Sequence, residues 1–571
     1  MDMQAHTRTL SDLLSLNKKY VVPRFQREYS WGRDEITALW KDICDQLKLK
    51  AGKLQPTEYF VGCLVLVGKD NSKEQKIVDG QQRLTTLTIL LRALITVLSA
   101  AGEDESAKSI YGKYIEGQDD DGKTFFKLIN ESPKPYFQNA IQHFSQEDQK
   151  PSSDEERLLK LAYDEFIDQL WPTKLLSQHT SVAYKDKLTA LREQILNHLK
   201  FIHVLVADED DAYTIFETLN ARGINLSAID LVKNWLLKHL PDEHPTDKAK
   251  SKWDGMKAVL ASSADPIDKD TFFRHFWLSN YGFVNEGRIY RSFKHLAEAG
   301  TIVASTFQDH LLEEARSYVR LVSPIAADAK HHLEREIFGS LSALNLFRVS
   351  AARPLLLALV RARADKKLSA SQHVRIMRDL ENFHFLYTAI TSGNSSGFDG
   401  RYSRAARDVR SASGPNVMGV ITELLATLKD KKPTIDVFKS GFHELWYSNE
   451  ETKNKRIIQY IFNRHERYLR KTKELAIDQI SLEHIAPQSA AKSIKDVYGK
   501  IGNLLPLDAD INSDAGSKIL KLKLNAYKKS QLKIVDQFAK KYASVLTWDA
   551  AQIEKRTDEL AYISYEKIWV L

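Results

Sequence analysis

The spacing of apolar residues changes within the first hundred positions of the chain, and the change predicts two strands followed by a helix. Residues 59–67 form a nearly unbroken apolar run, and a short run rich in β-forming residues predicts a strand. A polar turn over 69–73 leads to a second apolar run at 77–78, so the two runs predict a hairpin. Apolar residues then recur at i, i+3, i+7 and i+10 over 84–94, which is the spacing of a helix with one buried face. The polar stretch 79–83 therefore lies on a strand-to-helix turn.

The same patterns predict a chain that is mostly helical beyond its first part. Residues 245–430 carry apolar stripes at helical spacing almost throughout, whereas residues 101–160 are polar and predict loops between helices. Further predicted elements are a short helix and strand over 11–22, a helix over 34–47, a strand over 201–206, helices over 211–219 and after Ser227, and a strand over 477–485. Strands and helices together predict an α+β fold class.

The length of the chain predicts more than one domain. At 571 residues it is too long for a single hydrophobic core. The charged, proline-bearing stretch 428–434 has the composition of a linker. We expect an α/β N-terminal domain over 1–240, a helical middle region over 241–430 and a C-terminal domain over 431–571.

Composition narrows the class of protein. With 43% hydrophobic and 27% charged residues and no apolar run long enough to span a bilayer, the chain is expected to be soluble and to work without a membrane. Its start lacks the apolar region of a signal peptide, so we expect it in the cytoplasm. Two cysteines, Cys44 and Cys63, are too few for a disulfide framework or a Cys-rich zinc site, and we expect core thiols. A net charge of +7 permits nucleic-acid binding without requiring it.

The turn at 79–83 has residues that suit a phosphate. Gly80 lets the backbone approach a ligand, the following helix offers unpaired N–H groups, and Arg83 brings a planar set of donors. Gln81 and Gln82 add uncharged donors and acceptors. The alternative is structural: Asp79 caps the helix and Arg83 forms a surface ion pair.

An earlier loop is dense in side chains that bind anions and planar groups. Arg24 and Arg27 can bind phosphates, Gln26 can contact a base or ribose edge, and Tyr29 or Trp31 can stack on a ring. The aromatic pair can equally pack on the helix over 34–47, which is the role we expect for Trp31.

A second candidate site follows the predicted strand over 477–485. That strand ends in Glu483 and His484, and Asn503 and Asn512 follow before a helix predicted at about 515–530. A histidine at a strand end is placed to take a proton from water, and a divalent ion held by oxygen or nitrogen ligands would neutralise a phosphate. A structural role is the alternative, because Asn512 is also a good helix N-cap.

The predicted helix at 515–530 separates apolar and basic residues. Leu520, Leu524 and Tyr527 fall on one face. A second face carries four lysines with no acid among them, namely Lys518, Lys521, Lys528 and Lys529. We expect these lysines to contact DNA phosphates, and the alternative is a solvated helix face.

Three stretches in order resemble one family. Residues 76–86 contain Asp-Gly-Gln-Gln-Arg after an apolar hairpin, 22–31 contain Pro-Arg-Phe-Gln-Arg-Glu-Tyr-Ser-Trp, and 216–234 contain Phe-Glu-Thr-Leu-Asn-Ala-Arg-Gly. They resemble the N-terminal domain of GmrSD-type restriction proteins, which are type IV, modification-dependent systems. That domain is similar in fold to ParB and sulfiredoxin. The strand, loop, strand and helix around His484 resemble the ββα-metal unit of HNH nucleases, as found in the C-terminal domain of GmrSD-type proteins.

The resemblance implies roles for the residues of both sites. An NTP, either GTP or ATP, would bind through Gln26, Arg27, Asp79, Gly80, Gln81, Gln82 and Arg83. His484 would be the general base, Asn503 would orient it, and Glu483 and Asn512 would hold Mg²⁺ or Mn²⁺. HNH units often have Asp before the histidine and His at the last position, so Glu483 and Asn512 depart from the pattern.

The function implied by the resemblance is an NTP-regulated, metal-dependent DNA endonuclease that cuts modified phage DNA in defence. NTP hydrolysis and a homo-oligomer are left open. One alternative is a regulatory protein that binds NTP and nucleic acid through a degenerate HNH domain. Another is an abortive-infection nuclease that acts on RNA or on host DNA.

Overall fold

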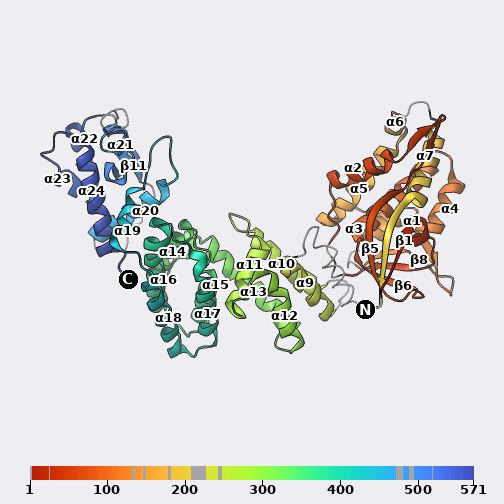
Figure 1. Cartoon of the computed structure of the whole chain (residues 1–571), viewed down its shortest axis with the longest axis horizontal. Coiled ribbons are helices and arrows are strands. Elements are labelled where there is room, and N and C mark those ends of the chain that lie inside the picture. The colour runs from red at the N-terminus through yellow and green to blue at the C-terminus, as the bar shows by residue number, and fades with distance from the viewer. Residues whose placement is uncertain are drawn as a thin grey trace. The chain divides into compact units, whose positions relative to one another are not determined.

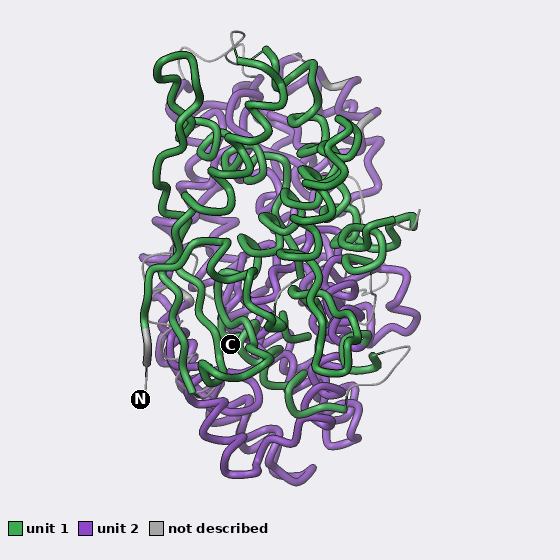
Figure 2. The backbone as a smooth tube through the Cα atoms, turned by 90° about the vertical axis from the view of Figure 1, so that its right-hand side faces the viewer, with its two compact units in different colours: residues 1–251 green, residues 252–571 purple. Residues whose placement is uncertain are grey.

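The computed structural model describes residues 3–571 except 25, 27, 132–135, 146–148, 178–181, 208–226, 242–246, 471–479, 488–493 and 517. The chain forms two compact units, Met1–Ser251 and Lys252–Leu571, which Figure 2 distinguishes by colour.

Unit 1 contains a six-stranded sheet with the order β1-β10-β5-β6-β2-β9. The strands of this unit are β1 Met3–Thr9, β2 Lys19–Val22, β3 Lys48–Lys50, β4 Lys53–Gln55, β5 Tyr59–Val67, β6 Glu74–Asp79, β7 Glu116–Gln118, β8 Thr124–Phe126, β9 Leu128–Asn130 and β10 Leu199–Val206. The sheet is mixed, because β5 pairs antiparallel with β6 and parallel with β10. The predicted hairpin is therefore confirmed and lies in the middle of the sheet.

Most helices of unit 1 pack on one face of this sheet, where their apolar residues join one core with those of the strands (Figure 1). The helices of unit 1 are α1 Leu10–Leu14, α2 Arg33–Asp45, α3 Gln81–Ala100, α4 Asp104–Tyr114, η1 Phe137–Gln142, α5 Asp154–Leu170, α6 Pro172–Leu175, α7 Tyr184–Glu193, η2 Gln194–His198, α9 Ala228–His239 and the start of α10 Lys248–Ala261. Helix α3 begins two residues before Arg83, so the strand-to-helix turn at 79–83 is also confirmed.

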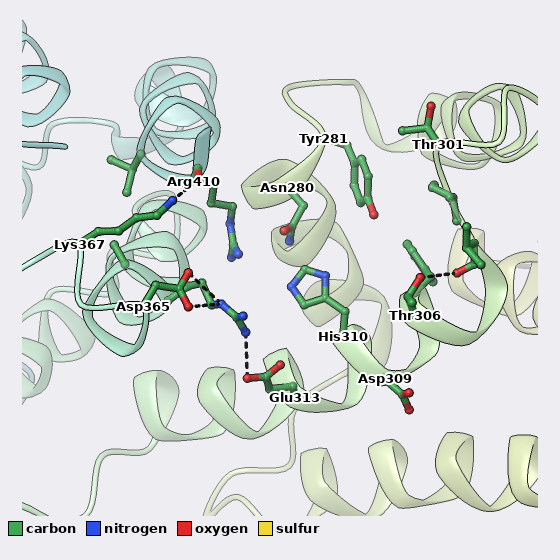
Figure 3. A pocket seen from close by; sticks show the side chains of 16 residues that line it. Asn280, Tyr281, Thr301, Thr306, Asp309, His310, Glu313, Asp365, Lys367 and Arg410 are labelled. Carbon is green, nitrogen blue, oxygen red and sulfur yellow. Dashed lines mark hydrogen bonds and ion pairs between the residues drawn. The ribbon is translucent and has the colours of Figure 1, made fainter. Parts of the chain in front are cut away.

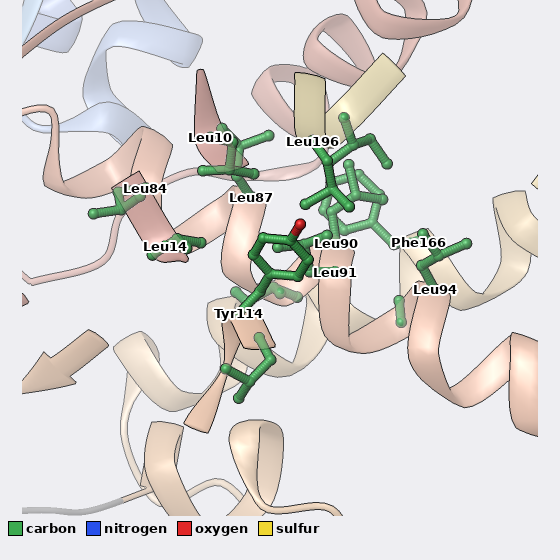
Figure 4. Packing of buried hydrophobic residues seen from close by; sticks show 14 of the residues in the cluster. Leu10, Leu14, Leu84, Leu87, Leu90, Leu91, Leu94, Tyr114, Phe166 and Leu196 are labelled. Atoms are coloured by element: carbon green, nitrogen blue, oxygen red, sulfur yellow. The ribbon is translucent and has the colours of Figure 1, made fainter. Parts of the chain in front are cut away.

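Helix α3 forms the centre of the core of unit 1. Its leucines pack among Leu10, Tyr114 and Phe166 (Figure 4). Along β5, Leu64 and Leu66 join this core while Val65 points to the other face of the sheet, as strand alternation requires. Among the described residues α3 is the one helix long and apolar enough to span a membrane, but 78% of its most apolar window is buried. We therefore interpret α3 as a core helix.

In its described residues, unit 2 is helical apart from the strand pair β11–β12. Its elements are α11 Lys269–Asn280, η3 Glu286–Arg288, α12 Ile289–Glu298, α13 Ala304–Val322, η4 Ala326–Asp328, α14 His332–Leu346, α15 Arg353–Ala364, α16 Ala370–His384, η5 Phe385–Ile390, η6 Ser395–Phe398, α17 Asp399–Ser411, α18 Gly414–Lys429, α19 Ile435–His443, α20 Lys455–Arg470, β11 Ser481–His484, η8 Ile501–Asn503, β12 Leu504–Leu507, α21 Ala509–Ala515, α22 Leu520–Tyr527, α23 Lys533–Lys541, α24 Ala550–Ile563 and η9 Ser564–Ile568. The mostly helical α+β character predicted for the chain is confirmed.

The middle and C-terminal regions share a core within unit 2. The predicted linker lies between α18 and α19, yet elements from both sides of it are in contact. The ring of Trp569 stacks on that of Phe385 with centroids 3.8 Å apart, and Tyr460 donates a hydrogen bond to Glu381 at 2.6 Å. Unit 1 ends at Ser251, near the predicted boundary at 240. The division into three domains stays a prediction.

Two predictions of local structure are wrong. Residues 101–160 contain α4, α5 and the strands β7, β8 and β9, not only loops between helices. Each of these strands has three residues, which is too short to show an alternating pattern. The helix predicted at about 515–530 is broken, because Gly516 has a positive φ of 50° and separates α21 from α22. The helix predicted over 211–219 lies outside the described residues.

Candidate functional site

Gly80 shapes the turn between β6 and α3. Its φ of 88° lies in the left-handed region, which a residue with a side chain adopts only at a cost. A Cβ at this position would also lie 2.9 Å from the carbonyl oxygen of Cys63 and from Leu64 Cδ1. Glycine therefore lets the first turn of α3 approach the backbone of β5. The N–H groups of a first turn have no acceptors within their own helix.

Arg83 lies across β5. Its Nη1 is 3.5 Å from the carbonyl oxygen of Cys63, a weak contact, and an added Cβ on Gly62 would come within 3.0 Å of its Cζ. Burial raises the pKa of the Cys63 thiol, and the nearby carboxylate of Asp79 raises it further. The positive charge of Arg83 acts to lower the same pKa. Cys63 thus belongs to this site, although a cysteine within an apolar strand gives no sequence signal for it. Cys63 and Cys44 are both free thiols of intermediate burial, whereas core thiols were predicted.

The glutamines of the motif hold the preceding loop in place. Gln81 and Gln82 are buried. Gln82 accepts a hydrogen bond from Ser30 N at 2.9 Å and donates one to Glu28 O at 3.0 Å. Gln26 donates to Val78 O at 3.2 Å, next to Asp79. The structure therefore brings Gln26 and residues 79–83 together at one end of the sheet, and Arg27 lies outside the described residues.

Other residues of this loop have structural partners. Arg24 pairs with Asp247 at 2.7 Å and donates to Leu237 O at 2.5 Å, so its guanidinium stabilises the region around α9. The hydroxyl of Tyr29 lies 2.8 Å from Thr86 Oγ1, and its ring is buried. Packing is therefore the role of Tyr29, and Trp31 is partly buried against the same core, as predicted for it.

The second candidate site is the antiparallel pair β11–β12, which brings His484 opposite Leu504. The turn before β12 packs closely on α24, because an added Cβ on Gly502 would lie 2.1 Å from Ile553 O. The buried Arg556 of α24 donates to the carbonyl oxygens of Gly502 at 2.7 Å and Leu504 at 2.8 Å. These contacts fix the position of the strand that pairs with His484.

His484 ends β11, as predicted, and its ring is held by Tyr447. Its Nε2 lies 3.0 Å from the carbonyl oxygen of Tyr447, and the two rings stack with centroids 5.6 Å apart. A carbonyl oxygen only accepts hydrogen bonds, so Nε2 carries the proton and Nδ1 is the basic nitrogen of the neutral ring. Burial lowers the pKa of His484, although its bond to Tyr447 acts to raise it. The ring is therefore neutral near pH 7, and sequence reasoning missed Tyr447.

Asn503 is fully buried and binds backbone groups. Its Oδ1 accepts from Ala486 N at 2.9 Å, and its Nδ2 donates to Ala486 O at 3.1 Å and Tyr498 O at 2.7 Å. Its own carbonyl accepts from Ile485 N at 2.8 Å. Asn503 therefore positions the chain that follows His484, which is an indirect way of orienting the histidine.

Glu483 lies in a buried ion pair with Lys523. Lys523 Nζ is 2.5 Å from Glu483 Oε1 and also 2.5 Å from His484 O, and both side chains are less than a tenth exposed. Tyr527 donates to the same carboxylate at 3.3 Å. Burial raises the pKa of Glu483 and lowers that of Lys523, against the attraction between the two charges. The ammonium group of Lys523 thus occupies the place beside Glu483 that a cation would need.

The predicted metal ligands do not converge. Asn512 donates to Ser481 Oγ at 2.8 Å, and Ser481 begins β11 whereas His484 ends it, about 10 Å along a strand. Glu483 and His484 are neighbours in that strand, so their side chains point to opposite faces. Asn512 also lies within α21, whose N-cap position is Asp508, and does not open a helix. Glu483 and Asn512 therefore do not fit one metal ion beside His484, and no group of three His, Cys, Asp or Glu that could hold a metal occurs in the described parts of the chain.

The four predicted DNA-contacting lysines are all exposed. Lys518 precedes α22, Lys521 lies within it, Lys528 is its C-cap and Lys529 follows. Leu520, Leu524 and Tyr527 form the buried face, as predicted.

The fifth lysine of this region, Lys523, was missed by sequence reasoning. It is three residues after Leu520 and four before Tyr527, a spacing that places it on the buried face. This spacing is the feature of the sequence from which the burial of Lys523 could have been predicted.

A cavity of about 560 Å³ lies in the helical middle region. Figure 3 shows Asn280, His310 and Arg410 around the same space. Two of its three cationic side chains are paired with acids: Arg410 lies 2.9 Å from Glu314, and Arg361 bonds to Glu313 and Asp365. The third, Lys367, donates a hydrogen bond to the carbonyl oxygen of Arg410 at 3.0 Å.

Comparison with known proteins finds a family match for an N-terminal and for a C-terminal part of the chain. Residues 10–237 match the family described as GmrSD restriction endonuclease, N-terminal domain, and residues 434–563 match GmrSD restriction endonucleases, C-terminal domain. Two such domains in one chain define a restriction-type nuclease, whose substrate is DNA. The chain belongs to the GmrSD family of restriction endonucleases, which confirms the resemblance seen in the motifs. It has no match among curated proteins.

Proposed function

We propose that this protein is an NTP-regulated, metal-dependent endonuclease that cuts modified foreign DNA in the cytoplasm as a defence against phage. The observation that carries the proposal is His484: it ends β11 within the GmrSD C-terminal match, and its Nε2 lies against Tyr447 O, so that Nδ1 is the basic nitrogen of the ring. The fixed orientation and lowered pKa of the ring suit a general base.

In the proposed reaction, Nδ1 of His484 takes a proton from water while the water oxygen attacks phosphorus. The bond from phosphorus to the leaving sugar oxygen breaks, and that oxygen takes a proton from a second water molecule, whose hydroxide is neutralised when His484 releases its proton. A bound divalent ion would neutralise the phosphate and the leaving oxygen. Because Glu483 and Asn512 do not converge with His484, no step of the reaction passes through them, and the ligands of the metal ion are not assigned.

The test is a matrix of substrates and cofactors. The full chain is incubated with plasmid, RNA and modified phage DNA, with Mg²⁺, Mn²⁺ or a chelator, and with GTP, ATP or neither. The proposal expects cutting of modified DNA only with metal, at a rate that changes with NTP. Cutting that is independent of metal, modification and NTP would contradict it.

A second candidate function rests on the Glu483–Lys523 ion pair. If this ammonium group permanently replaces a metal ion, the C-terminal region binds nucleic acid without cutting it, and the protein is a regulator. The same matrix distinguishes the two, because a regulator cuts none of the substrates. Cutting of RNA alone would point to an abortive-infection nuclease.

The nucleotide proposal predicts a role for Arg83. A charged hydrogen bond from its guanidinium to a phosphate is worth ~1.5–3 kcal/mol, so Arg83→Ala should weaken GTP or ATP binding by roughly ten- to a hundredfold. Arg83→Lys keeps the charge and loses the paired donors, so it should restore only part of the affinity. Calorimetric titration measures both, and equal affinity in wild type and Arg83→Ala would leave this turn as a helix cap.

The DNA-binding proposal predicts a salt effect for the exposed lysines. Lys521→Glu with Lys528→Glu should weaken DNA binding and reduce the slope of log affinity against log salt by about 0.9 for each lost phosphate contact. The matched control is Lys429→Glu with Lys431→Glu, which makes the same charge change at exposed positions far along the chain. Equal slopes in the two double variants would show that Lys521 and Lys528 contact only solvent.

A further inference from the structure

The loop over 23–32, between β2 and α2, contacts the turn at 79–83 through two of its described residues. Gln26 Nε2 donates a hydrogen bond at 3.2 Å to a main-chain carbonyl of β6, one residue before the turn. Gln82, in the first turn of α3, donates one at 3.0 Å from its side-chain amide to the carbonyl oxygen of Glu28. A ligand at the turn therefore lies beside side chains that already hold this loop.

The same two residues also contact the helices at the end of unit 1. Lys233 of α9 donates a hydrogen bond at 3.4 Å to the carbonyl oxygen of Gln26. Lys250 of α10 forms an ion pair with the carboxylate of Glu28 at 3.1 Å. Gln26 thus connects the turn to α9, and Glu28 connects it to α10.

A third residue of the loop, Arg24, holds the end of α9 and the start of α10. Its Nη2 donates to the carbonyl oxygens of Leu237 and Leu240, at the end of α9, both at 2.5 Å. Its Nη1 lies 2.7 Å from Asp247 Oδ2, and the other oxygen of that carboxylate accepts a hydrogen bond from Lys250 N in the first turn of α10. A displacement of the loop would therefore displace the start of α10.

Helix α10 belongs to both units. It begins at Lys248, whereas unit 1 ends at Ser251. In unit 2, Trp253 of this helix is buried, and Lys252 pairs with Asp309 of α13 at 2.5 Å. Because coupling between distant sites is carried by rigid secondary elements, α10 offers a path from the loop to the unit of the proposed nuclease site.

The hydrogen bonds of Gln26 are weak and therefore easily exchanged. Its amide lies 3.2 and 3.5 Å from the carbonyl oxygens of Val78 and Ile77, and its own carbonyl oxygen lies 3.4 Å from Lys233 Nζ. These distances are at the long end of the range for hydrogen bonds, where the interaction weakens. Gln26 is also among the residues predicted to bind a nucleotide, so a nucleotide that accepts its amide hydrogen breaks only weak bonds in the protein.

We propose that a nucleotide bound at the turn controls DNA cutting through this loop: it binds the amide of Gln26, and the loop then moves the start of α10 through Arg24 and Glu28. This coupling rests on the proposed function, because it needs both the nucleotide site and the nuclease. It adds the connection between them. Helix α10 lies outside both family matches, so the family assignment does not describe this connection.

The first measurement follows α10 by hydrogen exchange of the full chain, with and without GTP or ATP, in the absence of DNA. In the wild type, a bound nucleotide orders the loop that holds the helix, so exchange of the amides over 252–261 should slow by roughly five- to 150-fold, the usual size of coupling between two sites. Lys250→Met removes the partly exposed ion pair with Glu28, so it should cost little stability and leave the nucleotide site intact. Calorimetric titration should show that nucleotide still binds to this variant, but α10 should no longer respond.

Glu28→Gln removes the same ion pair from the side of the loop and keeps the main-chain bond to Gln82, so it should also abolish the response. Lys252→Met is the matched control, because it breaks the ion pair with Asp309 in the same helix and leaves the loop untouched. It should respond to nucleotide as the wild type does. In DNA cutting assays, the change in rate caused by NTP should disappear in the first two variants and persist in Lys252→Met.

The outcomes separate the coupling from the function on which it rests. If the wild type binds nucleotide but exchange in α10 does not slow, or if Lys250→Met and Lys252→Met respond alike, the coupling is wrong and the nucleotide site stands. If the wild type binds neither GTP nor ATP, the proposed function and the coupling both fail. If α10 responds as expected but no substrate is cut, the coupling holds and the nuclease is wrong.

Discussion

Replacing His484 with alanine will reduce DNA cutting by about 10²–10⁴-fold and will leave DNA binding nearly unchanged. The reduction is the usual contribution of a general base to proton transfer. The ring is held by Tyr447 O at 3.0 Å and is only 9% exposed, so its removal takes away the proposed base and little of the surface that DNA could contact. Nicking of supercoiled plasmid measures the first quantity, and a gel-shift titration measures the second.

The control for this variant is His295→Ala, which removes an exposed histidine of α12 in the same unit. It should cut and bind as the wild type does. If His484→Ala nicks DNA at the wild-type rate, the base is another residue and the proposed reaction is wrong. If cutting and binding fall together, the variant has disturbed the fold of the hairpin.

Replacing Lys523 with methionine will destabilise the protein by about 3–5 kcal/mol, because it leaves the buried carboxylate of Glu483 without its cation. The two side chains are 1% and 7% exposed, so water cannot replace the lost partner. Lys523 also bonds to His484 O at 2.5 Å, and its loss should therefore reduce DNA cutting as well. Denaturant unfolding followed by circular dichroism measures the change in the free energy of unfolding.

The paired control is Glu483→Gln combined with Lys523→Met. Removing both charges should restore most of the stability, because an uncharged pair carries no desolvation cost for an isolated ion. Lys521→Met, at the exposed position two residues earlier, should change stability little. Equal destabilisation by the Lys523 and Lys521 variants would contradict the buried ion pair.

The parts of the fold that could be predicted are those whose apolar pattern is long enough to show its period. The hairpin β5–β6 and helix α3 are examples. Strand β5 has nine residues and helix α3 has twenty, so each is long enough to show its pattern of apolar residues. Strand β1 is different: residues 5–8 are exposed at the edge of the sheet, and backbone bonds to β10 hold it without an apolar pattern. Strands β7–β9 are too short to be predicted from the sequence.

Only those features of the candidate site that depend on residues close together in the sequence could be predicted. The place of His484 at the end of a strand followed from the local pattern. The partners of Glu483 and Asn512 did not, because Lys523 lies 40 residues beyond Glu483 and Ser481 lies 31 before Asn512. Such pairings are set by how β11 packs on α21 and α22, which residue types alone do not fix.

The stacking of Trp569 on Phe385 limits how the chain can be divided. Trp569 is fully buried, and its ring also lies near Tyr460 of α20. A gene fragment beginning at the linker before α19 would lack Phe385 and would expose this indole to water. It would also lack Glu381, the hydrogen-bond partner of Tyr460 in α20. The C-terminal region is therefore not a module that can be fused alone to a DNA-targeting protein. Any transplant needs the helices of the middle region as part of the same folded piece.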